Sequence, residues 1–425
     1  MPLTRIEAHN FKSFRDLDVT LGSLNVLIGA NASGKSNFVQ LLRFVRDIAN
    51  FGLDNAASIQ GGSEYVANLR LGMAETTKVG LEIQEGNAFT WINLLPTDPA
   101  IRASVEGLRY EFAIHAIQGH AAYQVDRDQL SIFRKFFKRE TSSANSAIIG
   151  DGLLSLTNVS GNLVYSSELP EGITSEQANS AYWEALWSLF GLTEQPLEGL
   201  ILERVQRQVF LTPIPPIKII MQLAIYDFNA KLPKQTAQIT GKVDLEEDGN
   251  NLVIALKNIL EDEGQRREFS NLLHDVLPFA EGVDVQRLAD RFLHFRLRES
   301  YSGDQYLPAS LLSDGTIHVI ALLVALFFSD KPLIVIEEPE RNIHPYLLAR
   351  VAELLKDASR NKQIIVTTHN PEIVKNVALD DLLFVSRDRE GFSTIRRPAE
   401  SADVRVFLEN EIGIDELFAR NLLGA

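Results

Sequence analysis

Three short segments of the chain are mostly apolar. They are Ser23–Ile28, in which Ser23 and Asn25 are polar, Leu333–Ile336, and Gln363–Val366, in which Gln363 is polar. Strands of a parallel sheet show such runs when helices cover both faces, because neither face meets water. Segments with helical periodicity follow the first two, from Phe38 to about Phe51 and from Pro345 to Ala358. The pattern therefore predicts parallel α/β structure near both ends of the chain.

Alternating apolar and polar positions mark a second kind of segment in the first 170 residues. Alternation covers Leu3–Phe11, Leu17–Leu21, Lys78–Gln84, Gly107–Ile114 and Ala121–Ile132, and Gly150–Ser167 adds strand-and-turn sequence. A period of two is typical of antiparallel strands with one face in water. We expect an antiparallel β lobe here.

The middle of the chain changes to a helical pattern from about Ser175. A helix is predicted at Ala181–Phe190, and a Pro-rich turn at Pro213–Pro216 precedes a strand-like Ile217–Phe228. Further along, the pattern predicts helices at Asn251–Leu260 and Gln265–Val276 and strands at Val283–Val285 and Phe292–Arg298. This block carries no nucleotide-binding motif, so we interpret it as an inserted, helix-rich lid.

Composition narrows the class of protein. The 425 residues include no cysteine, which excludes disulfides and thiolate metal sites and is compatible with a reducing cytoplasm. The N-terminus is too polar for a signal peptide, and the longest apolar run, Val319–Phe328, is too short to span a bilayer. We expect a cytoplasmic protein without a membrane segment, with this run forming a buried core helix.

An octapeptide directly after the first apolar strand carries the strongest chemical signal. Gly29 to Ser36 (Gly-Ala-Asn-Ala-Ser-Gly-Lys-Ser) fits the P-loop pattern G-x-x-x-x-G-K-[ST] at every fixed position. Backbone N–H groups of such a turn surround nucleotide phosphates, and the helix start adds partial positive charge. Lys35 would neutralise phosphate charge, and the Ser36 hydroxyl would hold Mg²⁺. The expected nucleotide-binding residues are Gly29, Asn31, Ala32, Ser33, Gly34, Lys35, Ser36 and Asn37. The flanking strand and helix disfavour the alternative, a chance glycine-rich turn.

Two adjacent carboxylates follow the strand Leu333–Ile336. An acidic residue at the end of an apolar strand is the Walker B arrangement, which holds Mg²⁺ directly or through water. We assign the metal role to Glu337 and the polarisation of the attacking water to Glu338. The alternative is a solvated acidic turn.

Three more motifs surround these. His369 follows the strand Gln363–Val366 and could donate to the γ-phosphate or position the water. Ser313 and Gly315 stand at the start of the apolar helix, where free N–H groups can bind phosphate; a plain N-cap is the coexisting alternative. The loop Glu340–Pro345 would lie beside the hydrolytic site, or form a simple turn into the next helix.

Read in order, these motifs resemble the ABC-type ATPase heads of the RecF/SMC class, and more closely stand-alone ATPases related to the OLD family. The similar strings are Leu-Ser-Asp-Gly-Thr (312–316), Glu-Glu-Pro-Glu (337–340) with His-Pro (344–345), and Thr-Thr-His-Asn-Pro (367–371). The resemblance covers residues 1–90 and 300–400, and weakly 226–228 and 248–252. It implies an α/β, ABC-type P-loop NTPase head with mixed and parallel sheets, an antiparallel β lobe and an inserted α-rich lid. The corresponding regions are an N-terminal ATPase lobe (1–170), a lid or partner-binding insertion (171–300) and a C-terminal ATPase lobe (301–425).

The resemblance also implies a mechanism. ATP and Mg²⁺ would lie between Lys35, Ser36, Glu337, Glu338 and His369 of one copy and Ser313 and Gly315 of a second, forming a homodimer. Lys35, Glu338 and His369 would carry catalysis. The chain lacks the long coiled coil of SMC-type proteins and, as we expect, the Toprim nuclease domain of OLD proteins. Gln60 is a weak candidate for the glutamine-loop residue, and Lys12 and Arg15 are further candidates to approach the nucleotide.

Two functions remain open. The first is an ATPase that works on or near DNA, in repair or in anti-phage defence, with a partner that carries the nuclease or effector activity. The second is a nucleotide-gated scaffold without direct DNA contact, which the net charge of −15 favours slightly. The run Arg134–Arg139, basic residues interleaved with aromatics, is either a DNA contact or a strand edge with solvated charges. The Ser-Asp-Gly signature and the insertion argue against a transporter subunit.

Overall fold

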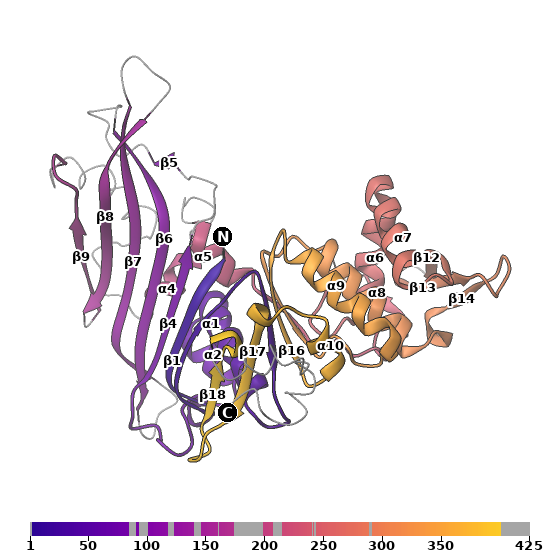
Figure 1. Cartoon of the computed structure of the whole chain (residues 1–425), viewed down its shortest axis with the longest axis horizontal. Coiled ribbons are helices and arrows are strands. Elements are labelled where there is room, and N and C mark those ends of the chain that lie inside the picture. The colour runs from indigo at the N-terminus through magenta and orange to yellow at the C-terminus, as the bar shows by residue number, and fades with distance from the viewer. Residues whose placement is uncertain are drawn as a thin grey trace. The chain divides into compact units, whose positions relative to one another are not determined.

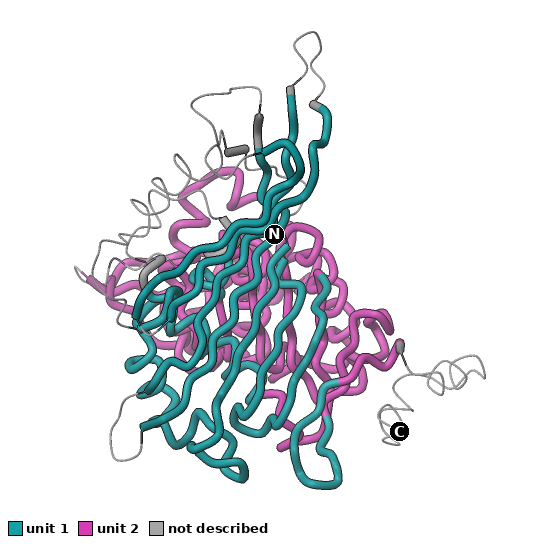
Figure 2. The backbone as a smooth tube through the Cα atoms, turned by 90° about the vertical axis from the view of Figure 1, so that its left-hand side faces the viewer, with its two compact units in different colours: residues 1–22, 37–223, 386–395 teal, residues 23–36, 224–385, 396–425 magenta. Residues whose placement is uncertain are grey.

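A computed structural model of the chain describes residues 2–84, 91–92, 101–117, 123–139, 146–159, 161–173, 199–206, 215–239, 241, 244–288 and 291–400. The chain forms two compact units, each assembled from separate segments (Figure 2). Unit 1 comprises residues 1–22, 37–223 and 386–395, and unit 2 comprises residues 23–36, 224–385 and 396–425. The expected insertion, 171–300, is therefore divided between the units after Leu223, while its helix at Ala181–Phe190 lies outside the described residues.

Unit 1 is built on an antiparallel sheet. Within the described residues the strand order is β2-β1-β4-β6-β7-β8-β9, and the long strands β6, β7 and β8 lie side by side (Figure 1). The strands are β1 (Leu3–Phe11), β2 (Phe14–Thr20), β4 (Thr77–Gln84), β5 (Trp91–Ile92, pairing with β6), β6 (Ile101–Ala116), β7 (Tyr123–Arg139), β8 (Ser146–Val159) and β9 (Asn162–Glu168). Buried positions alternate with more exposed ones along β2 and along most of β1 and β4, as the period of two predicts.

Helices complete unit 1. They are α1 (Lys35–Phe51), which begins in unit 2, α2 (Leu53–Ile59), α4 (Ile201–Gln206) and α5 (Pro215–Met221). Phe44 of α1 packs on Phe11 of β1, with ring centroids 5.8 Å apart. The prediction of one strand over Ile217–Phe228 is wrong, because α5 ends at Met221 and only Ala224–Tyr226 forms a strand, β10. Its apolar run was too short for periodicity to separate a buried helix from a strand.

A buried carboxylate ties α4 to the sheet of unit 1. Asp128 on β7 is fully buried and accepts hydrogen bonds from the Tyr110 hydroxyl (2.8 Å) and the Ile201 N–H (2.7 Å). The Asn158 side chain also donates to Asp128, at 3.5 Å. Burial raises the pKa of Asp128 to about 7, although each of these hydrogen bonds opposes the rise.

Unit 2 contains the parallel sheet that the apolar runs predict. Its strands are ordered β10-β15-β16-β3-β17, with every neighbouring pair parallel. They are β10 (Ala224–Tyr226), β15 (Leu333–Glu337), β16 (Gln363–Thr368), β3 (Leu24–Ile28) and β17 (Leu382–Arg387), after which β18 (Ser393–Arg396) pairs with β17. Helices α8 (Asp314–Phe327), α9 (Leu348–Ala358) and α10 (Pro371–Lys375) contribute to the core around this sheet.

Helix α8 is the apolar run of the sequence, and its residues 316–326 are all buried, as predicted. Of the described helices, none is long and apolar enough to cross a membrane. Beside α8 lie α6 (Leu252–Glu261) and α7 (Glu263–Val276), which pack on the hairpin of β12 (Ala280–Leu288) and β13 (Phe292–Glu299) (Figure 1). Two short strands, β11 (Ala237–Gln238) and β14 (Tyr306–Pro308), pair with β13. The predictions of both helices and both long strands are confirmed.

Candidate functional site

Three predicted motifs meet at one edge of the parallel sheet of unit 2. Strands β3, β16 and β15 are parallel neighbours, with Thr368 paired to Ile28 and Thr367 paired to Glu337. The residue after each strand therefore emerges at the same edge: Gly29 after β3, Glu338 after β15 and His369 after β16. Carboxyl ends of parallel strands are where α/β folds place ligands.

The P-loop turn begins at Gly29, directly after β3, where there is no space for a side chain. A Cβ at Gly29 would stand 2.2 Å from the carbonyl oxygen of Val385 and 2.8 Å from the Ser33 hydroxyl. Gly34 has φ 122° and Ala32 has φ 61°, both in the region that L side chains rarely adopt. The turn begins at the exposed residues 30–32 and leads into α1 at Lys35. Its backbone therefore has the sharp, glycine-dependent form that phosphate binding requires.

Lys35 points back over this turn. Its Nζ donates to the carbonyl oxygens of Gly29 (2.6 Å) and Ala30 (3.0 Å), and the residue is 8% exposed. Burial lowers the pKa of the Lys35 ammonium, while the negative charges of Glu338 and Glu340 act in the opposite direction. The Lys35 ammonium is thus held at the P-loop, where it interacts electrostatically with Glu338 and Glu340. Ser36, the next residue of α1, is exposed.

The acidic pair has one half-buried and one strained member. Glu337 is the last residue of β15. Glu338 follows with φ 47°, and its N–H donates to the Thr367 carbonyl (2.9 Å). Glu338 Oε1 lies 3.2 Å from Nδ1 of His369, so the two residues predicted to act on water are in contact. A non-glycine residue at positive φ beside reactive groups is typical of functional sites.

Four residues near this pair had no assigned role in the sequence. Arg341 donates to Glu338 Oε2 from Nη2 (3.1 Å) and to Asp227 Oδ1 from Nη1 (2.7 Å). Glu340 is 7% exposed and accepts a hydrogen bond of 2.6 Å from the Thr368 hydroxyl at Oε1. Burial raises the pKa of Glu340, and the Thr368 hydrogen bond opposes this. The Oε2 atom of Glu340 is buried without a hydrogen-bond partner among the described residues. The charged loop 340–345 was a signal for Glu340 and Arg341. Asp227 and Thr368 lie within the strings 226–228 and 367–371 of the family resemblance, but those strings assigned them no role.

The signature motif caps α8, as the alternative interpretation predicts. Ser313 Oγ accepts from the Thr316 N–H (3.1 Å), and Lys234 Nζ lies 2.5 Å from Asp314 Oδ1. A Cβ at Gly315 would stand 2.5 Å from the Asn342 carbonyl oxygen. The signature turn therefore packs directly on the loop that follows the acidic pair.

The remaining predicted residues lie in unit 1, whereas the P-loop lies in unit 2. Lys12 Nζ donates to the Tyr65 carbonyl (3.2 Å), and the Arg15 guanidinium pairs with Glu390 and stacks on Phe392 at 3.9 Å. Gln60 is 9% exposed, and neither its amide oxygen nor its nitrogen has a hydrogen-bond partner among the described residues. Their approach to a nucleotide stays a prediction.

The basic run at Arg134–Arg139 does not form one continuous surface. It lies on β7, where Arg134 is 2% exposed and its guanidinium lies 5.2 Å from the ring of the buried Phe136. Lys135 is half-buried and Lys138 is exposed. Because side chains alternate along a strand, the neighbours Arg134 and Lys135 point to opposite faces.

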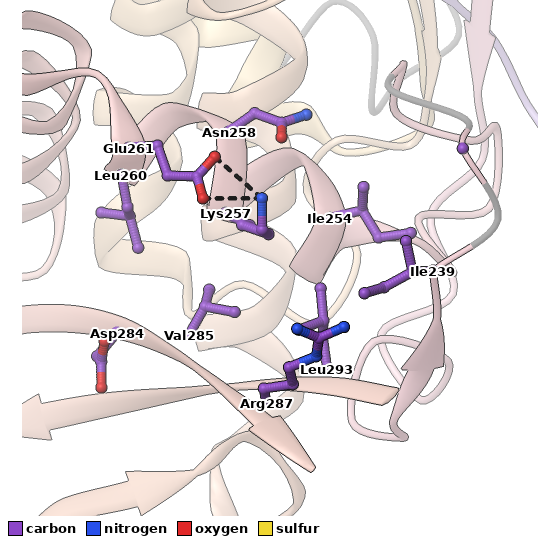
Figure 3. A pocket seen from close by; sticks show the side chains of 11 residues that line it. Ile239, Ile254, Lys257, Asn258, Leu260, Glu261, Asp284, Val285, Arg287 and Leu293 are labelled. Atoms are coloured by element: carbon purple, nitrogen blue, oxygen red, sulfur yellow. Dashed lines mark hydrogen bonds and ion pairs between the residues drawn. The ribbon is translucent and has the colours of Figure 1, made fainter. Parts of the chain in front are cut away.

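A cavity of about 630 Å³ lies between α6 and the hairpin β12–β13 in unit 2. Ile254, Val285 and Leu293 form apolar walls, and Lys257 and Glu261 pair with each other on α6 (Figure 3). Its lining residues belong to none of the motifs described above.

A family model agrees with the position of the motifs. Residues 24–174 and 222–375 match the family described as "AAA domain, putative AbiEii toxin, Type IV TA system". These two segments make up well over half of the chain.

Individual relatives match shorter segments. An uncharacterized protein of Methanocaldococcus jannaschii, MJECL43, is 24% identical over 169 residues, which are 36% of this chain and 44% of that protein. The Septu protein PtuA of Bacillus thuringiensis is 30% identical over 90 residues, 20% of this chain and 23% of that protein. The chain thus matches less than half the length of these relatives.

Among solved structures, an SMC head bound to the C-winged helix domain of ScpA is similar in fold. The TM-score is 0.50 with 14% identity, over 93% of this chain and 97% of that chain. Together with the P-loop, the acidic pair and His369 at one sheet edge, the matches show that this chain belongs to the family described as "AAA domain, putative AbiEii toxin, Type IV TA system" and is a P-loop ATPase with an SMC-head-like fold.

Proposed function

We propose that the chain binds ATP with Mg²⁺ at the sheet edge of unit 2 and hydrolyses it between two copies of itself. The observation that carries this proposal is the convergence of the Lys35 turn, Glu337–Glu338 and His369 at neighbouring strand ends. Lys35 would balance phosphate charge, Glu338 would polarise the attacking water, and His369 would orient that water or the γ-phosphate.

The residues fit a magnesium ion that arrives with the nucleotide. Mg²⁺ prefers one or two protein oxygens together with phosphate oxygens and water. The Ser36 hydroxyl is exposed at the start of α1, and Glu337 presents a carboxylate at the end of β15. These two residues would hold the ion, which would neutralise charge on the transferred phosphoryl group. The buried Oε2 of Glu340 has no hydrogen-bond partner among the described residues, which supports a further donor, such as water, at this site.

The negative charge of a triphosphate supports the proposed dimer. One P-loop covers one side of it, and the N–H groups at the start of a second copy's α8, at Ser313 and Gly315, would cover the other. The experiment is sedimentation of a Glu338→Gln variant with and without ATP and Mg²⁺. We expect an ATP-dependent dimer, because slow hydrolysis leaves the nucleotide in place. The matched control is the double variant Lys35→Ala/Glu338→Gln, which should stay monomeric. A Glu338→Gln protein that binds ATP but stays a monomer would rule out the sandwich.

The pathway we propose is DNA repair or antiviral defence with an effector partner. The family description names a toxin of a type IV toxin–antitoxin system, and the motifs resemble RecF/SMC and OLD ATPases. Direct DNA binding is tested by salt-dependent binding of the ATP-trapped protein, with Lys135 and Lys138 changed to Glu in separate variants, because side chains three positions apart on a strand point to opposite faces. Loss of DNA binding in a variant would support a DNA contact at β7. If the parent does not bind DNA even at low salt, direct DNA binding is excluded.

A nucleotide-gated scaffold is the second candidate. The net charge of −15 and the burial of Arg134 on β7 favour it. Capture of a protein partner by the Glu338→Gln variant only with ATP, in the absence of DNA binding, would support this function.

A further inference from the structure

The carboxylate of Glu338 is held at both oxygens. Oε1 faces Nδ1 of His369 at 3.2 Å, and Oε2 accepts from Nη2 (3.1 Å) and Nε (3.4 Å) of Arg341. The backbone of Glu338 is strained at φ 47°. A strained residue keeps its conformation only when its surroundings hold it there. The contacts of the side chain are therefore part of what fixes this group.

Arg341 is itself fixed from the other side. Its Nη1 donates to Asp227 Oδ1 at 2.7 Å, and the N–H of Asp227 donates to the Glu247 carbonyl at 2.9 Å. Asp227 directly follows β10, and Glu338 directly follows β15, the parallel neighbour of β10. The planar guanidinium thus joins the ends of two adjacent strands, and its rigid donor fork suits two carboxylates at once.

We infer that Arg341 is a positioning residue for ATP hydrolysis, which, together with Asp227, holds the Glu338 carboxylate in the direction from which it acts on water. This inference rests on the proposed role of Glu338. Without Arg341, the side-chain hydrogen bonds of the carboxylate within the described part of the chain would be reduced to the contact with His369, whose side chain is 51% exposed. The negative charges of Asp227 and of a bound triphosphate would then push it away from the reacting centre.

Loss of the Arg341 side chain should affect the rate of ATP hydrolysis and not the binding of ATP. The Lys35 ammonium is held by Gly29 and Ala30, whereas the Arg341 guanidinium, among the described residues, donates to Asp227 and Glu338. Replacing Arg341 should therefore lower kcat and leave KM for ATP nearly unchanged. A misplaced catalytic group commonly costs one to two orders of magnitude in rate.

The test compares steady-state ATP hydrolysis by the parent with that of Arg341→Ala, Arg341→Lys and Asp227→Asn. We expect kcat to fall by about 10- to 100-fold in Arg341→Ala with KM changed less than about threefold. Arg341→Lys should recover part of kcat, because one cation cannot serve both carboxylates with the same fork. Asp227→Asn should show a smaller fall than Arg341→Ala, since the Glu338 contact remains.

Chemical rescue distinguishes positioning from a structural role. Guanidinium ion at millimolar concentration should raise kcat of Arg341→Ala severalfold, whereas a loss of folding would not be reversed. The matched control is Arg350→Ala, an arginine paired with Glu353 on α9, which should keep parental kcat with and without guanidinium.

The parent and Glu338→Gln are measured first, to separate this inference from the proposed function. A parent without ATP turnover, or a Glu338→Gln variant with full turnover, overturns the proposed function. A parent that depends on Glu338 combined with an Arg341→Ala variant of unchanged or increased kcat overturns this inference alone. A fall in kcat without guanidinium rescue and with loss of folded structure by circular dichroism also overturns it, because Arg341 would then act on the fold.

Discussion

The buried carboxylate of Asp128 makes the stability of unit 1 depend on pH. Its folded pKa is raised from 3.8 to about 7, chiefly by burial, so the ionised form is disfavoured in the folded state. The stability contribution is therefore complete below the unfolded pKa of 3.8 and is lost as pH rises through about 7. A shift of about 3 pKa units corresponds to about 4 kcal/mol at 1.36 kcal/mol per unit.

The loss is spread over an accessible pH range. At pH 5 about 1.6 kcal/mol is already lost, and at pH 8 nearly the whole of about 4 kcal/mol is lost, so the difference is about 2.5 kcal/mol. The substitution Asp128→Asn removes this titration. The amide keeps one acceptor oxygen but cannot accept from both Tyr110 and Ile201, which costs about 1–3 kcal/mol at every pH.

Comparing the parent with Asp128→Asn at each pH isolates the contribution of Asp128 to stability, because all other titrating groups are the same in both proteins. We expect Asp128→Asn to gain about 2.5 kcal/mol of stability relative to the parent between pH 5 and pH 8. Urea dependence of amide hydrogen exchange in β6 and β7, corrected for the intrinsic rate at each pH, measures the stability of this unit. Asp151→Asn, at an exposed position of β8, controls for the change in net charge. If the difference in free energy of unfolding between the parent and Asp128→Asn stays constant from pH 5 to pH 8, the reasoning is refuted.

Two further predictions concern glycines whose surroundings leave no room for a side chain. Gly29→Ala should lower ATP affinity by at least about tenfold in calorimetry, because a Cβ 2.2 Å from the Val385 carbonyl oxygen forces the P-loop to shift. The control is Gly282→Ala, whose Cβ would lie 3.4 Å from its nearest neighbouring atom; this variant should bind ATP as the parent does. Gly315→Ala should weaken ATP-dependent dimerisation of the Glu338→Gln protein in sedimentation, because a Cβ 2.5 Å from the Asn342 carbonyl displaces the signature turn; unchanged dimerisation would show that this turn is not part of the interface.

Most of the fold could be predicted from local patterns. Apolar runs identified β3, β15 and β16, because a strand buried on both faces is apolar at most positions. Alternation identified β1 and β4, because a strand with one face in water has apolar side chains at every second position. The placement of Arg134 and Lys135 on opposite faces of β7 was not predicted, because the predicted strand ended at Ile132 whereas β7 continues to Arg139. The prediction failed at Ile217–Phe228, where an apolar run is compatible with either a short helix or a strand.

The sequence by itself determined the motifs whose residues are neighbours in the chain: the turn before Lys35, the acidic pair Glu337–Glu338, and His369 at a strand end. Their chemistry depends on local backbone geometry, which short-range sequence encodes. Only the tertiary structure decided that Asp227, separated from Arg341 by more than a hundred residues, anchors the guanidinium that holds Glu338. It also decided that the Thr368 hydroxyl meets Glu340 and that Gly315 packs on Asn342. These contacts arise from the order in which parallel strands pair, and strand order depends on packing across the whole sheet, which no local pattern records.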